Sequence, residues 1–129
     1  MTPENELNPI EKEFAASWGG MEQFYRGFDS PYWEFLKPIF DLISTMRKQG
    51  YDRRFRAGQS LWIFILSRSR QHGLRPDQHC IRIILHSQGG MTVEYCDGLN
   101  RNTNLDADHV ELTQELEALL QRLLAQPIN

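Results

Sequence analysis

The chain has 129 residues, of which 40% are hydrophobic and 24% are charged, and its formal net charge at pH 7 is −3. This length and balance allow one buried hydrophobic core, so we expect a single globular domain over residues 1–129, with residues 1–7 flexible. The longest apolar run has six residues, which is far too short to span a membrane, and the N-terminus lacks the pattern of a secretory signal. We therefore expect a cytoplasmic protein that does not contact membranes and whose two cysteines are reduced thiols.

The first predicted element is a helix that begins at Asn8-Pro9. Asparagine is a frequent N-cap, and proline suits the first helical position because its missing N–H needs no partner there. Apolar residues then recur at helical spacing on one face: Ile10, Phe14, Trp18 and Met21. Gly19-Gly20 is expected to weaken or split this helix.

Ser30-Pro31 predicts a second helix start for the same reason. Apolar residues over positions 32–46 are spaced three and four apart, so we expect an amphipathic helix over residues 31–49. Pro38 lies inside it and is expected to kink the helix or to divide it in two. Gly50 is expected to end it in the left-handed conformation.

Residues 61–66, LWIFIL, are apolar at both alternating positions and rich in β-branched and aromatic side chains. Such a run predicts a strand that is covered on both faces, or nearly so. Gly58 indicates a turn or bulge before this strand, and residues 53–56 are a candidate edge strand.

Residues 81–86 and 91–96 predict two strands of a β-hairpin, joined by the turn Gln88-Gly89-Gly90. The apolar residues of both strands are odd-numbered, so they share a face only if paired residue numbers add to an even value. We prefer a sum of 176 to 178 because it places Arg82 opposite Glu94, a favourable cross-strand pair. The same register places Cys80 opposite Cys96.

Residues 97–108, DGLNRNTNLDAD, are polar and predict a loop. A leucine stripe then predicts a helix over residues 112–124, with Asp106, Asp108 or Thr113 as its cap and Pro127 beyond its end. The order of elements predicts an α+β fold: N-terminal helices, an antiparallel sheet of three to four strands, and a C-terminal helix packed on the sheet.

Charge is segregated along the chain. Residues 47–82 hold nine Lys/Arg and two Asp/Glu, whereas residues 1–46 and 83–129 are each net negative. Arginine is the residue best suited to bidentate contacts with carboxylates and phosphates. The candidate binding residues are therefore five arginines at the rim of the predicted sheet: Arg56, Arg68, Arg70, Arg75 and Arg82.

Three interpretations of these arginines remain open. They bind an acidic protein partner or a small anion, they bind nucleic acid, or the acidic helices fold over them and neutralise them internally. A sequence pI near 5.8 argues against a dedicated nucleic-acid binder. The favoured prediction is a non-enzymatic partner-binding or regulatory module that binds an acidic partner or forms a homodimer; a nucleic-acid or phosphorylated-ligand binder is the alternative.

Trp33 and Phe40 lie beside the main apolar stripe of the helix predicted over residues 31–49. Extra apolar width on a helix indicates either a partner or dimer surface or a wider contact with the core. These two residues are the candidate apolar interface.

Motifs for chemistry are weak in this sequence. Cys80 and Cys96 with a histidine (His79, His86 or His109) form the basis of a second alternative, a small thiol or metal-dependent enzyme, but no Cys-x-x-Cys spacing supports it. Ser60, Ser67 and Ser69 near His72 lack the glycine pattern of a nucleophile elbow. We expect no catalytic residue, metal or cofactor.

Overall fold

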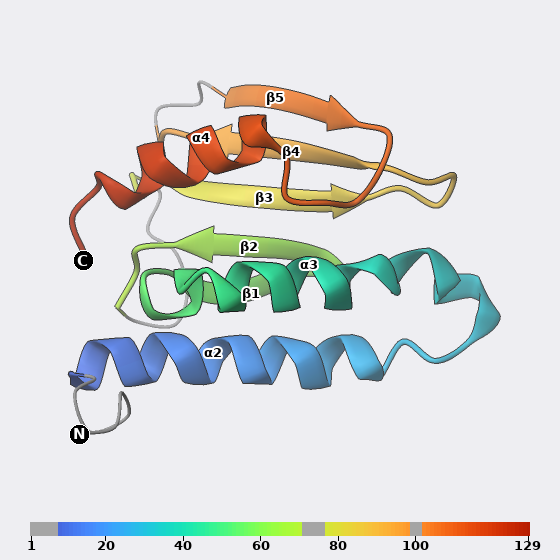
Figure 1. Ribbon diagram of the computed structural model, residues 1–129, viewed down its shortest axis with the longest axis horizontal. Coiled ribbons are helices and arrows are strands. Elements are labelled where there is room, and N and C mark those ends of the chain that lie inside the picture. The colour runs from blue at the N-terminus through green and yellow to red at the C-terminus, as the bar shows by residue number, and fades with distance from the viewer. Residues whose placement is uncertain (1–7, 71–76, 99–101) are drawn as a thin grey trace.

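The computed structural model describes residues 8–70, 77–98 and 102–129, and its fold is α+β (Figure 1). Five antiparallel strands form one sheet in the order β1-β2-β3-β4-β5. The strands are β1 (Arg56–Ser60), β2 (Ile63–Ser67), β3 (Cys80–Leu85), β4 (Met91–Cys96) and β5 (Asn102–Ala107). The α-helices are α2 (Pro9–Arg26), α3 (Pro38–Lys48) and α4 (Gln114–Leu124), with 3-10 turns η1 (Pro31–Leu36) and η2 (Tyr51–Arg53).

Helix α2 begins where the sequence predicts. The Asn8 side chain accepts a hydrogen bond from the Glu11 N–H, and the Glu11 carboxylate accepts one from the Asn8 N–H, which completes a capping box. The helix continues through Gly19-Gly20 without a break. Burial of Phe14 and Trp18 on either side of its centre offsets the cost of the glycines, which is about 1 kcal/mol each.

Helix α2 also covers an edge of the sheet. It runs beside β1 (Figure 1), where the Ser17 Oγ accepts a hydrogen bond from the Ala57 N–H at 2.9 Å. The Trp18 indole N–H donates to the Phe55 carbonyl, also at 2.9 Å. Side chains of α2 therefore satisfy backbone groups in and just before β1. In an uncovered edge strand such groups are exposed and can pair with other chains.

The helix predicted over residues 31–49 is divided at Pro38. The 3-10 turn η1 precedes it and α3 begins at Pro38 itself, because proline has no N–H to continue the earlier hydrogen-bond ladder. Gly50 follows α3 in the left-handed conformation at φ 85°, as predicted. The residues after it form η2 and not the start of an edge strand; β1 begins only at Arg56.

The strand predicted over residues 61–66 is shifted. Leu61 and Trp62 form the turn between β1 and β2, and β2 runs from Ile63 to Ser67. Leucine and tryptophan are not typical turn residues, so the sequence pattern does not reveal this turn. Leu61 has a φ of 56°, a left-handed conformation that is uncommon for a residue with a side chain.

The predicted register of the second hairpin is confirmed. Strands β3 and β4 pair with residue numbers that add to 176, which places Arg82 opposite Glu94 and Cys80 opposite Cys96. The prediction of three to four strands is wrong, because residues 102–107 of the expected loop form β5 against β4. This edge strand has few apolar side chains because it needs burial only at Leu105 and Ala107, which pack against the core.

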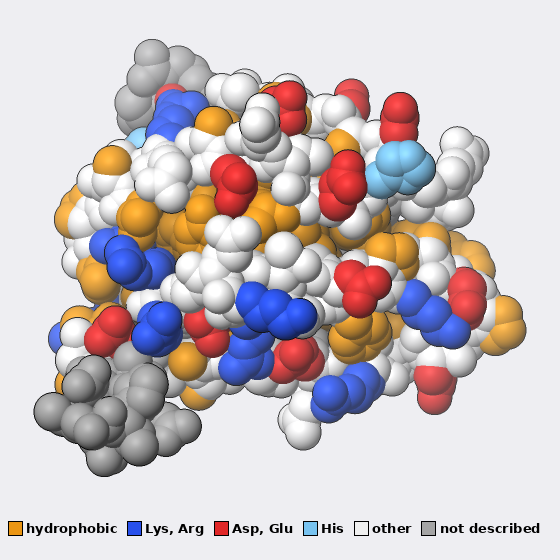
Figure 2. Space-filling model, viewed as in Figure 1, with side chains coloured by type: hydrophobic (Ala, Val, Ile, Leu, Met, Phe, Trp, Pro, Cys, Tyr) orange, Lys and Arg blue, Asp and Glu red, His pale blue; other side chains and the backbone are white. Residues whose placement is uncertain are grey.

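The two faces of the sheet differ. Helices α3 and α4 lie over one face (Figure 1) and enclose the core, in which Trp18, Phe64 and Tyr95 are large and fully buried. On the helical side of the molecule, hydrophobic side chains form a band between α4 and α3, bordered by charged groups (Figure 2). Helix α4 starts at the Thr113 cap, whose hydroxyl accepts from the Leu116 N–H at 3.0 Å.

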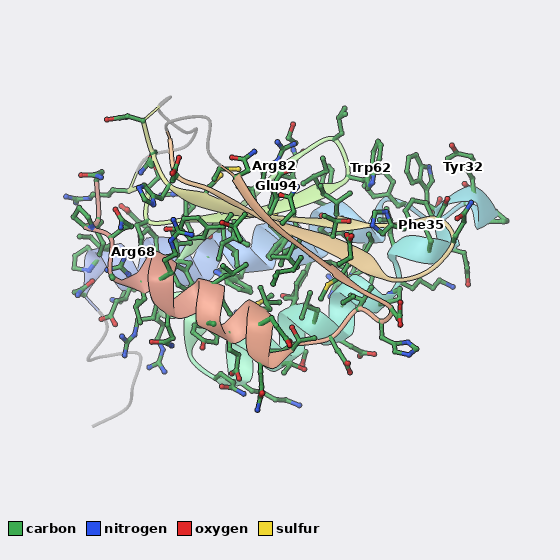
Figure 3. The ribbon with its side chains drawn as sticks, turned by 90° about the horizontal axis from the view of Figure 1, so that it is seen from above. Tyr32, Phe35, Trp62, Arg68, Arg82 and Glu94 are labelled. Atoms are coloured by element: carbon green, nitrogen blue, oxygen red, sulfur yellow. The ribbon has the colours of Figure 1, made fainter. Side chains whose placement is uncertain are left out.

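The opposite face of the sheet is not covered by any helix in the part of the chain that the structure describes. Half-buried side chains of alternate residues form it: Ile63, Ile65, Arg82, Ile84, Thr92 and Glu94. Arg82 and Glu94 lie on the side of the sheet away from α4 (Figure 3). We call this surface the open face.

Candidate functional site: the arginine end

Five arginines gather at the end of the molecule where β1 begins and β2 ends. We call them the arginine end: Arg53, Arg54, Arg56, Arg68 and Arg70. Three were predicted site residues, whereas Arg53 and Arg54 were not singled out. Tertiary structure brings Arg54 into the group through its contact with Arg68, 14 positions away in sequence, and Arg53 is its neighbour in the chain and lines the same hollow.

Arg56 and Arg68 are held in place by backbone carbonyls. The Arg56 guanidinium donates to the carbonyls of Ser69 at 3.0 Å and Arg70 at 2.6 Å, and it lies 5.9 Å from the Phe14 ring centroid. Hydrogen bonds to carbonyls orient a guanidinium but leave its positive charge in place. The guanidiniums of Arg56 and Arg68 therefore have a fixed direction and remain cationic.

Arg68 connects three parts of the chain. Its guanidinium donates to the Arg54 carbonyl at 2.6 Å and to the Gln126 carbonyl, beyond α4, at 3.1 Å. Burial, and then the positive charge of Arg54, lower the pKa of Arg68 from its ordinary value. The backbones of Arg68 and Arg70 also pair with Asn129, which places the C-terminal residue against the arginine end.

Two of the predicted arginines, Arg75 and Arg82, are not part of the arginine end as described. Arg82 is on the open face, where its guanidinium contacts the Glu94 carboxylate at 3.3 Å, and Figure 3 shows it away from Arg68. Arg75 falls outside the described residues. Of the four predicted arginines within the described residues, Arg56, Arg68 and Arg70 are together and Arg82 is separate.

Internal neutralisation applies to only part of the basic segment. Arg47 contacts Glu22 at 2.6 Å and Asp52 at 3.3 Å, and Arg82 contacts Glu94. Within residues 8–70, 77–98 and 102–129, no carboxylate forms an ion pair with an arginine of the arginine end. Among the described residues, this cluster is therefore a part of the basic segment with which the acidic helices form no ion pair.

A hollow of about 270 Å³ opens beside Arg53 and Arg54. We call it the arginine hollow; its other walls are Glu11, Gln49, Gly50, Tyr51, Gln121 and Leu124. The left-handed turn at Gly50 shapes it, because a Cβ at this position would lie 3.1 Å from the Arg53 Nη2. The hollow therefore brings two arginines, one glutamate and neutral side chains together in one concave place.

Trp33 and Phe40, the predicted apolar interface, lie in different surroundings. Trp33 belongs to an aromatic cluster at the other end of the molecule and contacts Trp62 with ring centroids 6.0 Å apart. A second hollow of about 380 Å³ lies there, lined in part by Tyr32, Trp33, Phe35 and Trp62, three of which are labelled in Figure 3. Phe40 is half-buried and packs against the core.

The cysteines face each other as predicted, and their surroundings make both thiols less acidic. Burial, followed by the neighbouring Cys96, raises the pKa of Cys80 to about 12, and burial also raises the pKa of Cys96. Both thiols therefore hold their protons more strongly than an ordinary cysteine does, which lowers their reactivity as nucleophiles.

The histidines and serines are dispersed. The His79 Nδ1 is 2.7 Å from the Tyr95 hydroxyl, and the His86 Nε2 is 2.7 Å from the Thr92 hydroxyl. Over the described ranges there is no group of three or more His, Cys, Asp or Glu side chains that is able to hold a metal. Ser67 and Ser69 are buried, and His72 lies outside the described residues.

Comparison with known proteins adds no relative: no family model, curated protein or solved structure matches this chain. Among the described helices, none is long and apolar enough to cross a membrane.

Proposed function

We propose that this protein is a non-enzymatic partner-binding module whose arginine end docks on an acidic surface of another protein. The observation that carries the proposal is the group of five clustered arginines with no ion-pair partner among the described residues. Clustered charge of one sign steers a complementary surface toward it and rejects surfaces of like charge.

The positions of the guanidiniums favour specific docking over diffuse attraction. Arg56 and Arg68 are held by carbonyls, so they lose little side-chain entropy when a carboxylate approaches. Arg53, Arg54 and Arg70 are exposed, and their guanidiniums have no hydrogen-bond partner in the part of the chain that the structure describes. The cluster thus combines two fixed cations with three adaptable ones.

A protein partner fits better than nucleic acid. The whole chain is net negative, and the two segments that flank the basic one are acidic. A long polyanion would therefore be repelled outside the arginine end, whereas a local acidic patch need contact only the arginines. We place this module in the cytoplasm, because both cysteines are free in the structure and a reducing compartment keeps them so.

Capture from native lysate tests the proposal. The wild type is compared with Arg54→Glu/Arg70→Glu, which reverses two exposed charges without removing a side-chain hydrogen bond. The control is Arg26→Glu/Lys37→Glu, which makes the same change in charge at exposed positions outside the arginine end and also removes the exposed ion pair of Lys37 with Glu34. Each is run with and without nuclease, and light scattering of the purified protein detects a homodimer.

The expected result is a protein retained by wild type and control, lost in the arginine-end variant and unaffected by nuclease. Capture that disappears with nuclease favours the nucleic-acid alternative. Capture that is equal for all three proteins overturns the arginine end as the docking site.

A further inference from the structure

The arginine hollow contains donors that nothing in the described fold uses. Arg53 and Arg54 line it, the Arg53 Nη2 lies beside Gly50, and neither guanidinium forms a hydrogen bond or ion pair with a described residue. Both residues are exposed, so their charges remain accessible to a ligand. Their convergence on one concave place indicates an anionic ligand.

Neutral donors complete the hollow. The Tyr51 hydroxyl accepts a hydrogen bond from the Gln121 amide at 3.3 Å, which leaves the hydroxyl proton of Tyr51 available to a ligand. Tyr51 itself is buried, so its hydroxyl has a fixed position. The exposed amide of Gln49 lies on the rim.

This set of donors suits a phosphate better than a carboxylate. The arginines, tyrosine and glutamines that line the hollow carry more hydrogen-bond donors than the two oxygens of one carboxylate accept, whereas a phosphate monoester has three terminal oxygens and up to two negative charges. We infer that the arginine hollow binds the phosphate group of a phosphorylated side chain on the acidic partner. This inference rests on the proposed function and names the group that the site recognises.

Glu11 opposes the ligand and therefore provides a sharp test. Its carboxylate lines the hollow and is held there by the N–H of Asn8 at 3.2 Å. Glutamine also serves at this position of a capping box. Glu11→Gln thus removes the negative charge while keeping the start of α2, and it is expected to tighten phosphate binding severalfold.

The experiment titrates the full-length, ¹⁵N-labelled protein with N-acetyl-phosphoserine amide and follows the Gly50 amide signal by NMR. N-acetyl-serine amide, acetate and inorganic phosphate are the comparison probes, all at one ionic strength. The expected result is a saturable shift with the phosphoserine probe, weaker binding of inorganic phosphate, and no saturable shift with the serine probe or acetate. Equal binding of phosphoserine and inorganic phosphate overturns recognition of a phosphorylated side chain.

Variants locate the binding. Arg53→Gln/Arg54→Gln is expected to weaken binding about tenfold or more, and Arg53→Lys/Arg54→Lys to give an intermediate loss, because lysine keeps the charge but not the fork. Arg26→Gln/Lys37→Gln has the same net charge as the first variant and is expected to bind like the wild type. Equal weakening by both glutamine variants means that net charge alone attracts the probe, which overturns the site. Thermal unfolding shows whether each variant is folded.

The outcomes separate this inference from the proposed function. If phosphoserine binds no better than serine while an acidic protein is still captured through the arginine end, the hollow is not a phosphate site and the docking proposal stands. If the phosphoserine probe binds but the arginine-end variant still captures the partner, the partner docks elsewhere, and the recognition of its phosphate fails together with the proposed function.

Discussion

The Arg68 guanidinium donates a 2.6 Å hydrogen bond to the Arg54 carbonyl and so connects the end of β2 with the segment that precedes β1. It also reaches the Gln126 carbonyl at 3.1 Å. Arg68 is thus both a member of the arginine end and a connection between separate parts of the chain. Mutation can test the second role by itself.

Arg68→Ala is expected to lower the free energy of unfolding by about 2 kcal/mol, because two charge-assisted hydrogen bonds are lost at a partly buried site. Arg70→Ala, whose exposed guanidinium has no partner among the described residues, is expected to change it by less than about 0.5 kcal/mol. Urea denaturation followed by circular dichroism measures both. Similar losses in the two variants would contradict the connecting role of Arg68.

Leu61→Gly is expected to stabilise the protein by about 1 kcal/mol. Leu61 occupies the left-handed region at φ 56°, which is costly for a residue with a Cβ, and it is 71% exposed, so its removal sacrifices little burial. Leu61→Ala retains the Cβ and is the control, for which we expect no gain. A glycine variant no more stable than the alanine variant in urea denaturation refutes this account of the turn.

Ser17→Ala is expected to destabilise the protein by about 1–2 kcal/mol, since it leaves the Ala57 N–H of β1 without its hydrogen-bond acceptor. Ala16→Ser, at an exposed neighbouring position of α2, is the control and is expected to be nearly neutral. Chemical denaturation compares the two. Hydrogen exchange of the Ala57 amide should also accelerate in Ser17→Ala; unchanged exchange would show that α2 does not protect this edge.

Alkaline pH is expected to destabilise the protein through its cysteines. The pKa of Cys80 is about 12 in the fold against an ordinary value of 9.0. The unfolded chain therefore loses this proton at lower pH than the folded chain, so the contribution to stability is complete below about pH 9 and is lost as pH rises toward 12.

Cys80→Ala/Cys96→Ala removes both thiols and is the comparison. We expect its free energy of unfolding to fall less steeply between about pH 8.5 and 10.5 than that of the wild type. Thiol titration at pH 8 with an aromatic disulfide reagent should be slow for the wild type until denaturant is added. Rapid labelling of the native protein contradicts the suppressed reactivity of the pair.

Much of the local structure follows from the sequence because it depends on neighbouring residues. The start of α2 is determined by Asn8 and Glu11, whose side chains each accept a hydrogen bond from the other's backbone N–H, and by Pro9, which needs no partner at the first position. The register of β3 and β4 follows from alternation, which excludes a shift by one residue, and from the favourable pairing of Arg82 with Glu94, which excludes a shift by two.

Features that depend on distant neighbours were decided only by the tertiary structure. Leu61-Trp62 is apolar like the strand after it, yet the chain turns there because β2 pairs antiparallel with β1. Strand β5 is polar in sequence and forms because β4 offers it unpaired backbone groups. The arginine end exists because carbonyls of the chain hold Arg56 and Arg68 beside Arg53 and Arg54, while only Arg47 and Arg82 of the basic segment meet carboxylates among the described residues. Composition and periodicity determine what each residue prefers locally, but which charge meets which partner depends on positions that only the folded chain brings together.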